Sequence, residues 1–398
     1  MGVRIYMLLK LLTFSVLFSF SGQVLHSEEY EDPFAEDSQS GNSAEALFFQ
    51  LEQNILVKSA TKIKQTLTDA PSIISVITAD QIRYRNYQSV AEALADLPGF
   101  FVGNDHAFYD AGVRGVTGEL RGKSRTLKVM INGQPISFRI ETANFIGKEL
   151  IPMSAIEKIE VIRGPGSALY GANAFLGVVN IVTKTGEQVS GGGLATKAVI
   201  FGENLGYSGE FYAGEKFGDL DVFISVAKNR TDRSGLKLDS SQKSLNGAIP
   251  GIFEKESFDD ISQPTSIFTS FSYDLGKAGE ISAFMNHQSI DTRASFADWG
   301  TLNHLDGVEA SGNRIGLENN LLSGKYTLGF LDGKAELSVG TNYAEGKAAD
   351  HDELRKGNDP GTVISRDHYG YEGIDIFGEF RYTIYEDAAE DAEDNLRN

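Results

Sequence analysis

The strongest candidate for chemistry in this sequence is a glycine-rich loop within residues 157–184, EKIEVIRGPGSALYGANAFLGVVNIVTK. The loop carries four glycines: Gly164, Gly166, Gly171 and Gly177. Such a loop could cradle a phosphate with its backbone. The spacing, however, fits neither G-x-G-x-x-G nor G-x-x-x-x-G-K-[ST], so we predict no nucleotide site here.

The same loop does not support serine chemistry. Ser167 would be a nucleophile elbow only within G-x-S-x-G, which requires glycine where Pro165 and Leu169 stand. Two β-type runs, 158–162 and 178–183, flank the loop. We therefore predict a structural loop that joins two strands, built on Gly164, Pro165, Gly166, Gly171 and Gly177.

Composition excludes further classes of function. The sequence has no cysteine, which rules out disulfides, thiolate metal sites, cysteine nucleophiles and a lipoprotein anchor. The six histidines show neither H-E-x-x-H nor paired spacing, so each is expected at the surface or in a loop. A net charge of −19 argues against nucleic acid as a partner. We predict no catalytic residue, no metal site and no cofactor.

The N-terminal region has the pattern of an exported protein. Arg4 and Lys10 precede the apolar core Leu11–Phe20, which is too short to span a bilayer. Small residues follow, and Ser21 or Ser27 would mark the cleavage, so residues 1–27 are predicted to be a signal peptide. Residues 28–53 are predicted to be a flexible leader, because acidic side chains dominate them.

Residues 54–61 form a short β-prone segment between this leader and the next domain. Such a segment can add to an exposed sheet edge through backbone hydrogen bonds. An ordinary first strand of the following domain is the alternative, since short apolar runs are ambiguous.

Residues 62–185 have the pattern of one α+β domain. Strands are predicted at 72–78 and 126–131, and Asn132-Gly133 predicts a tight turn after the second. Three capping boxes predict helix starts: Thr78 with Gln81, Ser89 with Glu92, and Ser154 with Glu157.

Residues 186–385 alternate between apolar and other side chains, as membrane-barrel strands and soluble sandwiches do. Leu220, Val222, Ile224 and Val226 share one face of a strand, against Asp221, Phe223, Ser225 and Ala227 on the other. Short turns at 274–279 and 331–334 contrast with the longer polar stretches 229–263, 292–313 and 346–368. Residues 386–398 are acidic, lack strand character and are predicted to lie outside the barrel.

The order of motifs resembles one known family. ISVITADQI, ALADLPGF, AGVRGV and KVMINGQPI precede the loop of 157–184 along the chain. In sequence and in order, these motifs resemble the plug domain of TonB-dependent outer-membrane receptors. The resemblance implies an α+β plug domain followed by antiparallel transmembrane β-barrel strands. The eight to ten strand candidates here would be a partial set, the N-terminal portion of a 22-stranded plugged barrel.

The resemblance also implies roles for individual residues. The TonB contact would be Asn54, Ile55, Leu56, Val57, Lys58, Ser59 and Ala60, with Lys58 departing from the family's usual apolar or small residue. Arg114 and Arg163 would lie in the plug–barrel contact, paired with carboxylates of the barrel wall. The outward plug loops would bind ligand through His106, Phe108, Tyr109, Phe138 and Arg139.

The resemblance implies energised uptake of a scarce metal chelate or cofactor. The ligand expected first is a ferric siderophore, and the location is the cell outer membrane of a Gram-negative-type bacterium. The partners would be TonB with its inner-membrane energising complex, the ligand and outer-membrane lipid. A passive porin would lack the domain of 62–185. Two alternatives stay open: a soluble exported β-rich binding module, and a truncated receptor fragment that does not transport, because so few strands cannot close around a plug.

Overall fold

The computed structural model describes the residues 56–57, 65–66, 74–104, 107–117, 122–235, 260–293, 314–331, 334–356, 359–364 and 368–382. The chain divides into two units, 1–55 and 56–398, and all described residues belong to the second. The predicted signal peptide, acidic leader and acidic tail therefore lie outside the described residues. Among the described residues, no helix is both long and apolar enough to cross a lipid bilayer.

The first part of the second unit is an α+β domain, here called the plug. Its five-stranded sheet has the order β3-β8-β9-β6-β7, with β6 and β9 parallel and the other pairs antiparallel. The strands are β3 (Ile74–Thr78), β6 (Leu127–Ile131), β7 (Gln134–Pro135), β8 (Ile156–Arg163) and β9 (Gly177–Thr183). The helical elements are α3 (Ala79–Arg85), α4 (Val90–Ala95), the 3-10 turn η1 (Met153–Ala155), α5 (Ser167–Tyr170) and α6 (Gly186–Val189).

Local sequence explains how the first plug helices begin. Thr78 caps α3 with a complete capping box, since its side chain accepts from Gln81 N and the Gln81 side chain accepts from Thr78 N. The Ser89 side chain caps α4 by accepting from Glu92 N at 3.3 Å. The prediction at Ser154 is wrong, because Ser154 lies within η1 and the chain enters β8 at Ile156.

Two small antiparallel pairs complete the plug side. β4 (Phe100–Asn104) pairs with β5 (Tyr109–Val113). β1 (Leu56–Val57) pairs with β2 (Gln65–Thr66), so part of the predicted TonB segment forms a strand. The rest of Asn54–Ala60 lies outside the described residues.

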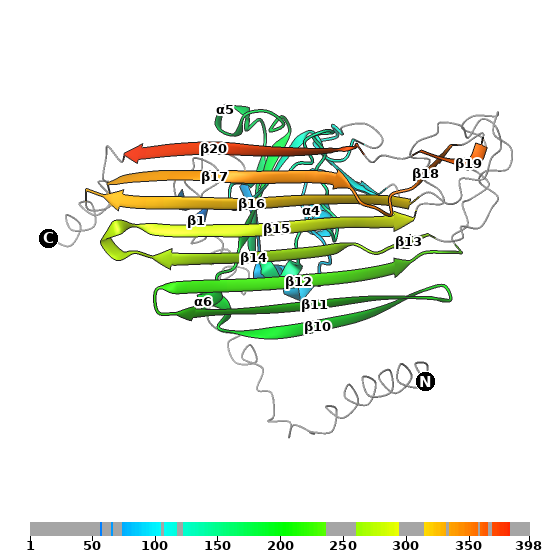
Figure 1. Cartoon of the computed structure of the whole chain (residues 1–398), viewed down its shortest axis with the longest axis horizontal. Coiled ribbons are helices and arrows are strands. Elements are labelled where there is room, and N and C mark those ends of the chain that lie inside the picture. Colours follow the sequence, from blue (N-terminus) through cyan, green and yellow to red (C-terminus); the bar gives the residue numbers. More distant parts are fainter. Residues whose placement is uncertain are drawn as a thin grey trace, which may run out of the picture. The chain divides into compact units, whose positions relative to one another are not determined.

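The second part is a nine-stranded antiparallel sheet whose strands run side by side from β10 to β20 (Figure 1). The order is β10-β11-β12-β13-β15-β16-β17-β20, with β14 between β12 and β15. The strands are β10 (Gly191–Phe201), β11 (Asn204–Phe217), β12 (Leu220–Asp232), β13 (Ile261–Ser262), β14 (Thr265–Asp274), β15 (Glu280–Arg293), β16 (Arg314–Phe330), β17 (Ala335–Ala348) and β20 (Gly370–Tyr382). A separate pair joins β18 (Leu354–Lys356) and β19 (Asp359–Ile364), and the 3-10 turn η3 (Gly276–Ala278) links β14 to β15.

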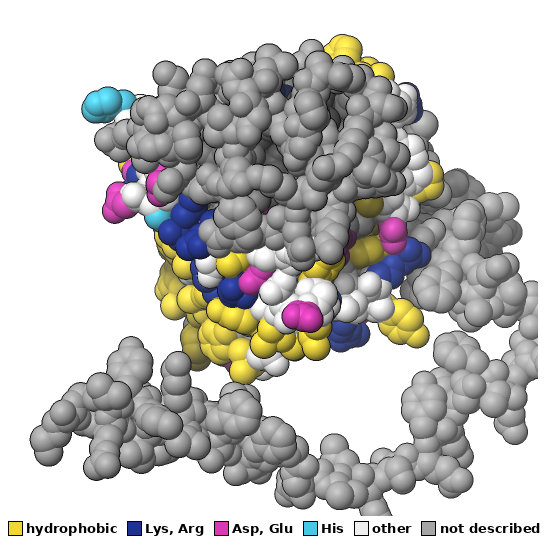
Figure 2. Space-filling view, turned by 90° about the vertical axis from the view of Figure 1, so that its right-hand side faces the viewer, with side chains coloured by type: hydrophobic (Ala, Val, Ile, Leu, Met, Phe, Trp, Pro, Cys, Tyr) yellow, Lys and Arg dark blue, Asp and Glu magenta, His cyan; other side chains and the backbone are white. Residues whose placement is uncertain are grey.

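The two faces of this sheet differ in chemistry. The inner face packs on the plug and buries polar side chains such as Ser225, Asn286 and Asn319. The outer face exposes apolar side chains on neighbouring strands, among them Ile224, Phe271, Met285, Leu322, Val339 and Ile376. In a space-filling view, hydrophobic side chains gather along one flank, bordered by Lys and Arg (Figure 2). Apolar side chains on the outer face are typical of a sheet that faces lipid.

The connections define two edges of the sheet. At the short-turn edge, brief turns join β11 to β12, β14 to β15 and β16 to β17. At the long-loop edge lie the longer intervals 233–260, 294–313 and 349–369. We use these two names below, because the plug meets the sheet differently at each edge.

Candidate functional site

The candidate site is the seam between plug and sheet, where polar side chains of the inner face bond to the plug backbone. Asparagine amides from β15 and β16 and a serine hydroxyl from β14 donate to plug carbonyl oxygens. The bonds join Asn286 to Leu150 at 3.0 Å, Asn319 to Ile136 at 2.9 Å and Ser266 to Lys148 at 3.3 Å. A side-chain donor thus satisfies each of these carbonyls, without a shared β-ladder.

Carboxylates on the first strands hold the end of the plug. Asp221 of β12 accepts from the backbone of α6, with Oδ1 at 2.6 Å from Gly186 N and Oδ2 at 2.7 Å from Glu187 N. Glu210 of β11 accepts from Ser154 N at 2.5 Å. These hydrogen bonds hold plug residues 154 and 186–187 to the neighbouring strands β11 and β12.

An aromatic cluster closes the seam near the long-loop edge. Phe138 is fully buried, with its ring centroid 5.7 Å from Phe145, 5.7 Å from Tyr369 and 5.4 Å from Tyr371. Phe108 stacks on Phe145 at 5.2 Å. Buried aromatic rings in this arrangement supply both area and specific geometry. This part of the seam is apolar and tightly packed.

A charge pair lies beside the cluster. Arg139 Nη1 is 3.3 Å from Asp375 Oδ1 of β20, and Nη2 bonds the other carboxylate oxygen. Both side chains are about half exposed, so the pair contributes little to stability. The Arg139 guanidinium also lies 5.9 Å from the centre of the Tyr371 ring.

The structure shows where the predicted ligand residues lie. Neighbouring aromatic rings bury Phe108 and Phe138. Tyr109 lies in β5 and is half-buried, with its pKa raised mainly by burial. Arg139 points to Asp375. His106 lies outside the described residues. Their role in binding a ligand stays a prediction.

Arg114 and Arg163 make their hydrogen bonds within the plug. Arg163 donates to Pro98 O and to Ser75 Oγ, each at 2.9 Å, and Arg114 donates to Arg163 O at 3.4 Å. The structure therefore shows both arginines bracing plug elements against each other. Within the described part of the chain, no carboxylate of the sheet pairs with either of them.

The glycine-rich loop has steric reasons for its composition. Gly164 and Gly171 take positive φ, of 145° and 69°. A Cβ at Gly177 would lie 2.6 Å from Ile162 O, and one at Gly166 would lie 2.7 Å from the Val178 side chain. Close packing between β8 and β9 therefore requires these small residues, which supports the structural role predicted for the loop.

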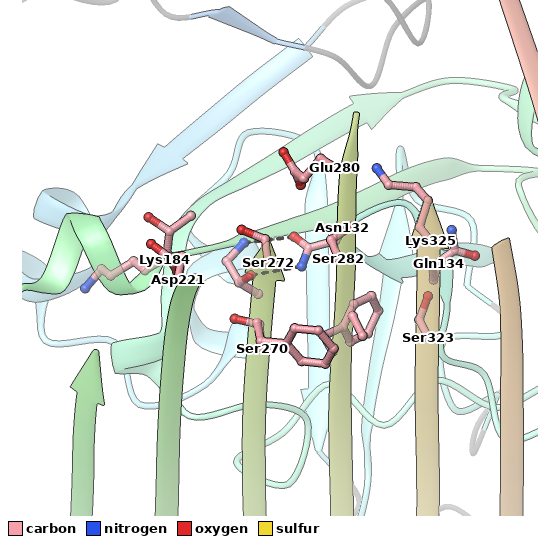
Figure 3. Close-up of a pocket in the computed structure, with 15 residues that line it drawn as sticks. Asn132, Gln134, Lys184, Asp221, Ser270, Ser272, Glu280, Ser282, Ser323 and Lys325 are labelled. Atoms are coloured by element: carbon pink, nitrogen blue, oxygen red, sulfur yellow. Dashed lines mark hydrogen bonds between the residues drawn. The ribbon is translucent and has the colours of Figure 1, made fainter. Parts of the chain in front are cut away.

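A polar pocket of about 240 Å³ lies where the plug meets the short-turn edge. Asn132 and Thr183 share two hydrogen bonds at its plug wall, of 2.9 and 3.1 Å. Figure 3 shows Lys184 and Asp221 on one side of the pocket and Gln134 and Lys325 on the other. Serine hydroxyls complete the sheet wall: Ser270, Ser272, Ser282 and Ser323. Such a lining is polar enough to hold water.

The plug also buries the carboxyl group of Glu149. Glu149 is 8% exposed and accepts from Gly147 N at 2.8 Å. Burial raises the pKa of this carboxyl, while the backbone hydrogen bonds and the neighbouring Lys148 act in the other direction. Across the described residues, no group of three or more His, Cys, Asp or Glu side chains is placed to hold a metal ion.

Sequence reasoning missed the residues of the sheet that hold the plug. Asn286, Asn319, Tyr371 and Asp375 are all absent from the predicted site. The available signal was the alternation itself, since a polar side chain on the inward face of a strand needs a partner once it is buried. The partner, however, lies far away in sequence and cannot be read from spacing.

Comparison with known proteins gives the class. Residues 66–178 match the TonB-dependent Receptor Plug Domain family. The chain is 35% identical over 150 residues to an iron-regulated outer membrane virulence protein of Vibrio cholerae, covering 36% of this chain and 22% of the relative. It is 39% identical over 142 residues to the vitamin B12 transporter BtuB of Photobacterium profundum, covering 34% and 22%.

Solved structures agree on the fold. The ferric-catecholate import receptor Fiu of Escherichia coli aligns with a TM-score of 0.53 at 16% identity, covering 81% of this chain and 48% of that one. The ferric enterobactin receptor PfeA of Pseudomonas aeruginosa aligns with a TM-score of 0.52 at 18% identity, covering 77% and 46%. The chain thus spans less than half of these receptors, and about a fifth of the first two relatives.

The chain therefore carries a TonB-dependent receptor plug domain followed by antiparallel strands of the plugged-barrel fold. The predicted fold class, the resemblance to TonB-dependent receptors and the outer-membrane location are confirmed. One of these relatives is named a transporter, and both solved structures are named receptors. The domain boundaries at 62–185 and 186–385 stay predictions.

Proposed function

We propose that this protein is a TonB-dependent receptor that captures a scarce metal chelate or cofactor at the outer membrane for energised uptake. One observation carries the proposal. A plug-family domain is held, by separate polar contacts, against the inner face of a sheet whose outer face is apolar. A soluble binding module does not account for that apolar outer face, which water would have to cover.

The form of the seam supports a plug that can be displaced. Its contacts include side-chain hydrogen bonds to plug carbonyls, such as those of Asn286 and Asn319. Each such bond contributes a net of about 0.5–1.5 kcal/mol. Bonds of this kind can break one after another and re-form, whereas a continuous β-ladder would resist movement as a unit.

The long-loop edge is the proposed ligand side. Plug residues 138–145 reach this edge, where Phe138 packs on Tyr369 and Tyr371. Arg139 offers a half-exposed guanidinium beside them. Aromatic rings with a nearby cation suit an anionic, ring-bearing chelate. We place the ferric siderophore class first for this reason, ahead of a vitamin B12 type of ligand.

The proposed partner on the opposite side is TonB, contacted through Asn54–Ala60. The pairing of Leu56–Val57 with Gln65–Thr66 supports an extended conformation for this segment. An extended segment can add as a strand to a partner's sheet edge. A non-transporting form is the second candidate, because β10 and β20 are edge strands within the described part of the sheet.

Ligand capture tests the proposal directly. The full chain, purified in detergent, is incubated with radiolabelled ferric enterobactin or labelled vitamin B12, and the retained label is counted. We expect saturable retention of the ferric chelate, weakened in Arg139→Ala and kept in Arg83→Ala. The control, Arg83, is an exposed arginine of α3 paired with Asp80. Retention no greater than in detergent without the chain, for both probes, would contradict the proposal.

A further inference from the structure

A second cavity, of about 370 Å³, lies between the plug and the first strands of the sheet. The plug contributes α3, residues 148–156 and Lys184, and the sheet contributes β10, β11 and β12. Cationic side chains outnumber acidic ones in the lining. The charged residues are Arg83, Lys148, Lys184, Lys197, Asp80 and Glu210.

The two acidic groups of the lining already have partners. Asp80 pairs with Arg83 at 3.0 Å. Glu210 accepts the backbone N–H of Ser154 at 2.5 Å. Asp80 is neutralised by Arg83, and Glu210 balances part of the charge of the three lysines, so a net positive charge remains inside the cavity.

The three lysine ammonium groups have no ion pair and no side-chain hydrogen bond within the described part of the chain. Lys148 and Lys184 come from the plug, whereas Lys197 comes from β10. All three are half-buried. Lys184 Nζ lies 6.0 Å from the centre of the Tyr212 ring. Donors of this kind, when half removed from water, are costly to leave unmatched.

Their surroundings add to this cost. Burial lowers the pKa of Lys148, and the positive charge of Lys197 lowers it further, against the opposing effects of Glu92 and Glu149. Burial also lowers the pKa of Lys184, with a smaller effect in the same direction from Arg83, against Glu210, Asp80 and Glu157. A bound anion would relieve both the desolvation and the repulsion.

We propose that this cavity binds a small multivalent anion, a phosphate or a polycarboxylate, which bridges Lys148 and Lys184 of the plug to Lys197 of the sheet. A lysine ammonium presents three donors and acts as a point charge, which suits tetrahedral and carboxylate oxygens. Because the lysines come from both sides of the seam, the anion ties the plug to β10. Its loss returns like charges to face each other across the seam.

Titration calorimetry on the full chain in detergent tests the site, with inorganic phosphate and citrate in separate arms and chloride as the background salt. Lys148→Gln, Lys184→Gln and Lys197→Gln should each weaken binding about tenfold, which corresponds to about 1.4 kcal/mol. The matched control is Lys277→Gln, an exposed lysine of η3 outside the cavity. No saturable binding of either anion, or equal loss in the control, would overturn the proposal.

A second measurement needs no charge-removing variant. Lysines carrying a ¹³C-labelled methyl group report their pKa by NMR, and single Lys→Arg changes assign the signals. Saturating phosphate or citrate should raise the pKa of Lys148 and Lys184 and leave that of Lys277 unchanged. Unchanged signals for Lys148 and Lys184 would refute the site. Binding that is lost in Lys148→Gln but kept in Lys197→Gln would refute the bridge to the sheet.

Discussion

Asn319 of β16 donates a hydrogen bond from Nδ2 to the carbonyl oxygen of Ile136 in the plug, at 2.9 Å. The same side chain accepts from the Tyr371 hydroxyl at 2.6 Å, which joins β16, β20 and the plug at one buried point. Asn319 is therefore central to the seam.

Asn319→Ala should loosen the plug. The change leaves Ile136 O buried without this donor, at a cost of about 1–3 kcal/mol. We expect faster amide hydrogen exchange in plug residues around 134–144, measured by mass spectrometry on the full chain. The control is Asn320→Ala, which removes a bond to His287 within the sheet. Equal exchange in the plug for both variants would show that the Asn319 contact does not hold it.

Phe138→Ala should lower the free energy of unfolding by more than Asn319→Ala does. Removing a fully buried aromatic ring leaves a cavity and loses contacts with three neighbouring rings, at about 3–5 kcal/mol. Chemical denaturation of the full chain measures the free energy of unfolding. The control is Phe101→Ala, since that side chain is 63% exposed. A loss no larger than in the control would contradict the anchoring role.

Glu149 should make stability depend on pH. Burial raises the pKa of its carboxyl above the ordinary value of 4.5, so the folded state holds this proton more tightly than the unfolded chain does. The stabilisation that comes from this tighter proton binding is fully present below about pH 4.5, and it is lost as the pH rises through the folded-state pKa. The Gln side chain of Glu149→Gln cannot ionise. As the pH rises, the free energy of unfolding of this variant should therefore increase relative to that of the unaltered chain.

Denaturation curves at several pH values above 4 check this sign, with Glu157→Gln as a partly exposed control from the same domain. A gap between Glu149→Gln and the unaltered chain that stays constant with pH would show that Glu149 ionises at little cost in the folded state.

Sheet closure gives another prediction. β10 and β20 stand at the two ends of the nine-stranded sheet in the described residues, and unpaired strand edges are not tolerated in lipid. The 398-residue chain alone should therefore give no heat-modifiable band on gel electrophoresis of outer-membrane fractions. A stable heat-modifiable band would indicate that this chain closes into a barrel alone or with copies of itself.

The sequence predicted the parts of the fold that local rules control. Alternation located the strand around Val222, and the Thr78 capping box located α3. The Ser154 box failed because β8 pairs with β3 and β9, and these tertiary contacts outweigh a local helix start. The resemblance implied that Phe138 contacts ligand, and no local pattern predicted that distant aromatic residues bury it.

The candidate site was less accessible to sequence reasoning. Every bond of the seam joins residues far apart in the chain, and 183 positions separate Asn319 from Ile136. Such pairs depend on how the plug docks on the sheet, which no spacing rule encodes. The three lysines of the second cavity likewise come together only in the folded chain.

The central claim is that this chain is a receptor that TonB engages through Asn54–Ala60. Calorimetric titration of the purified full chain with the periplasmic domain of TonB tests it most directly. Leu56→Pro removes a backbone donor and restricts φ, which strand pairing does not tolerate. The control, Leu51→Pro, makes the same change outside the segment. The account predicts that the unaltered chain and Leu51→Pro bind and that Leu56→Pro does not, whereas equal binding by all three, or binding by none, would contradict it.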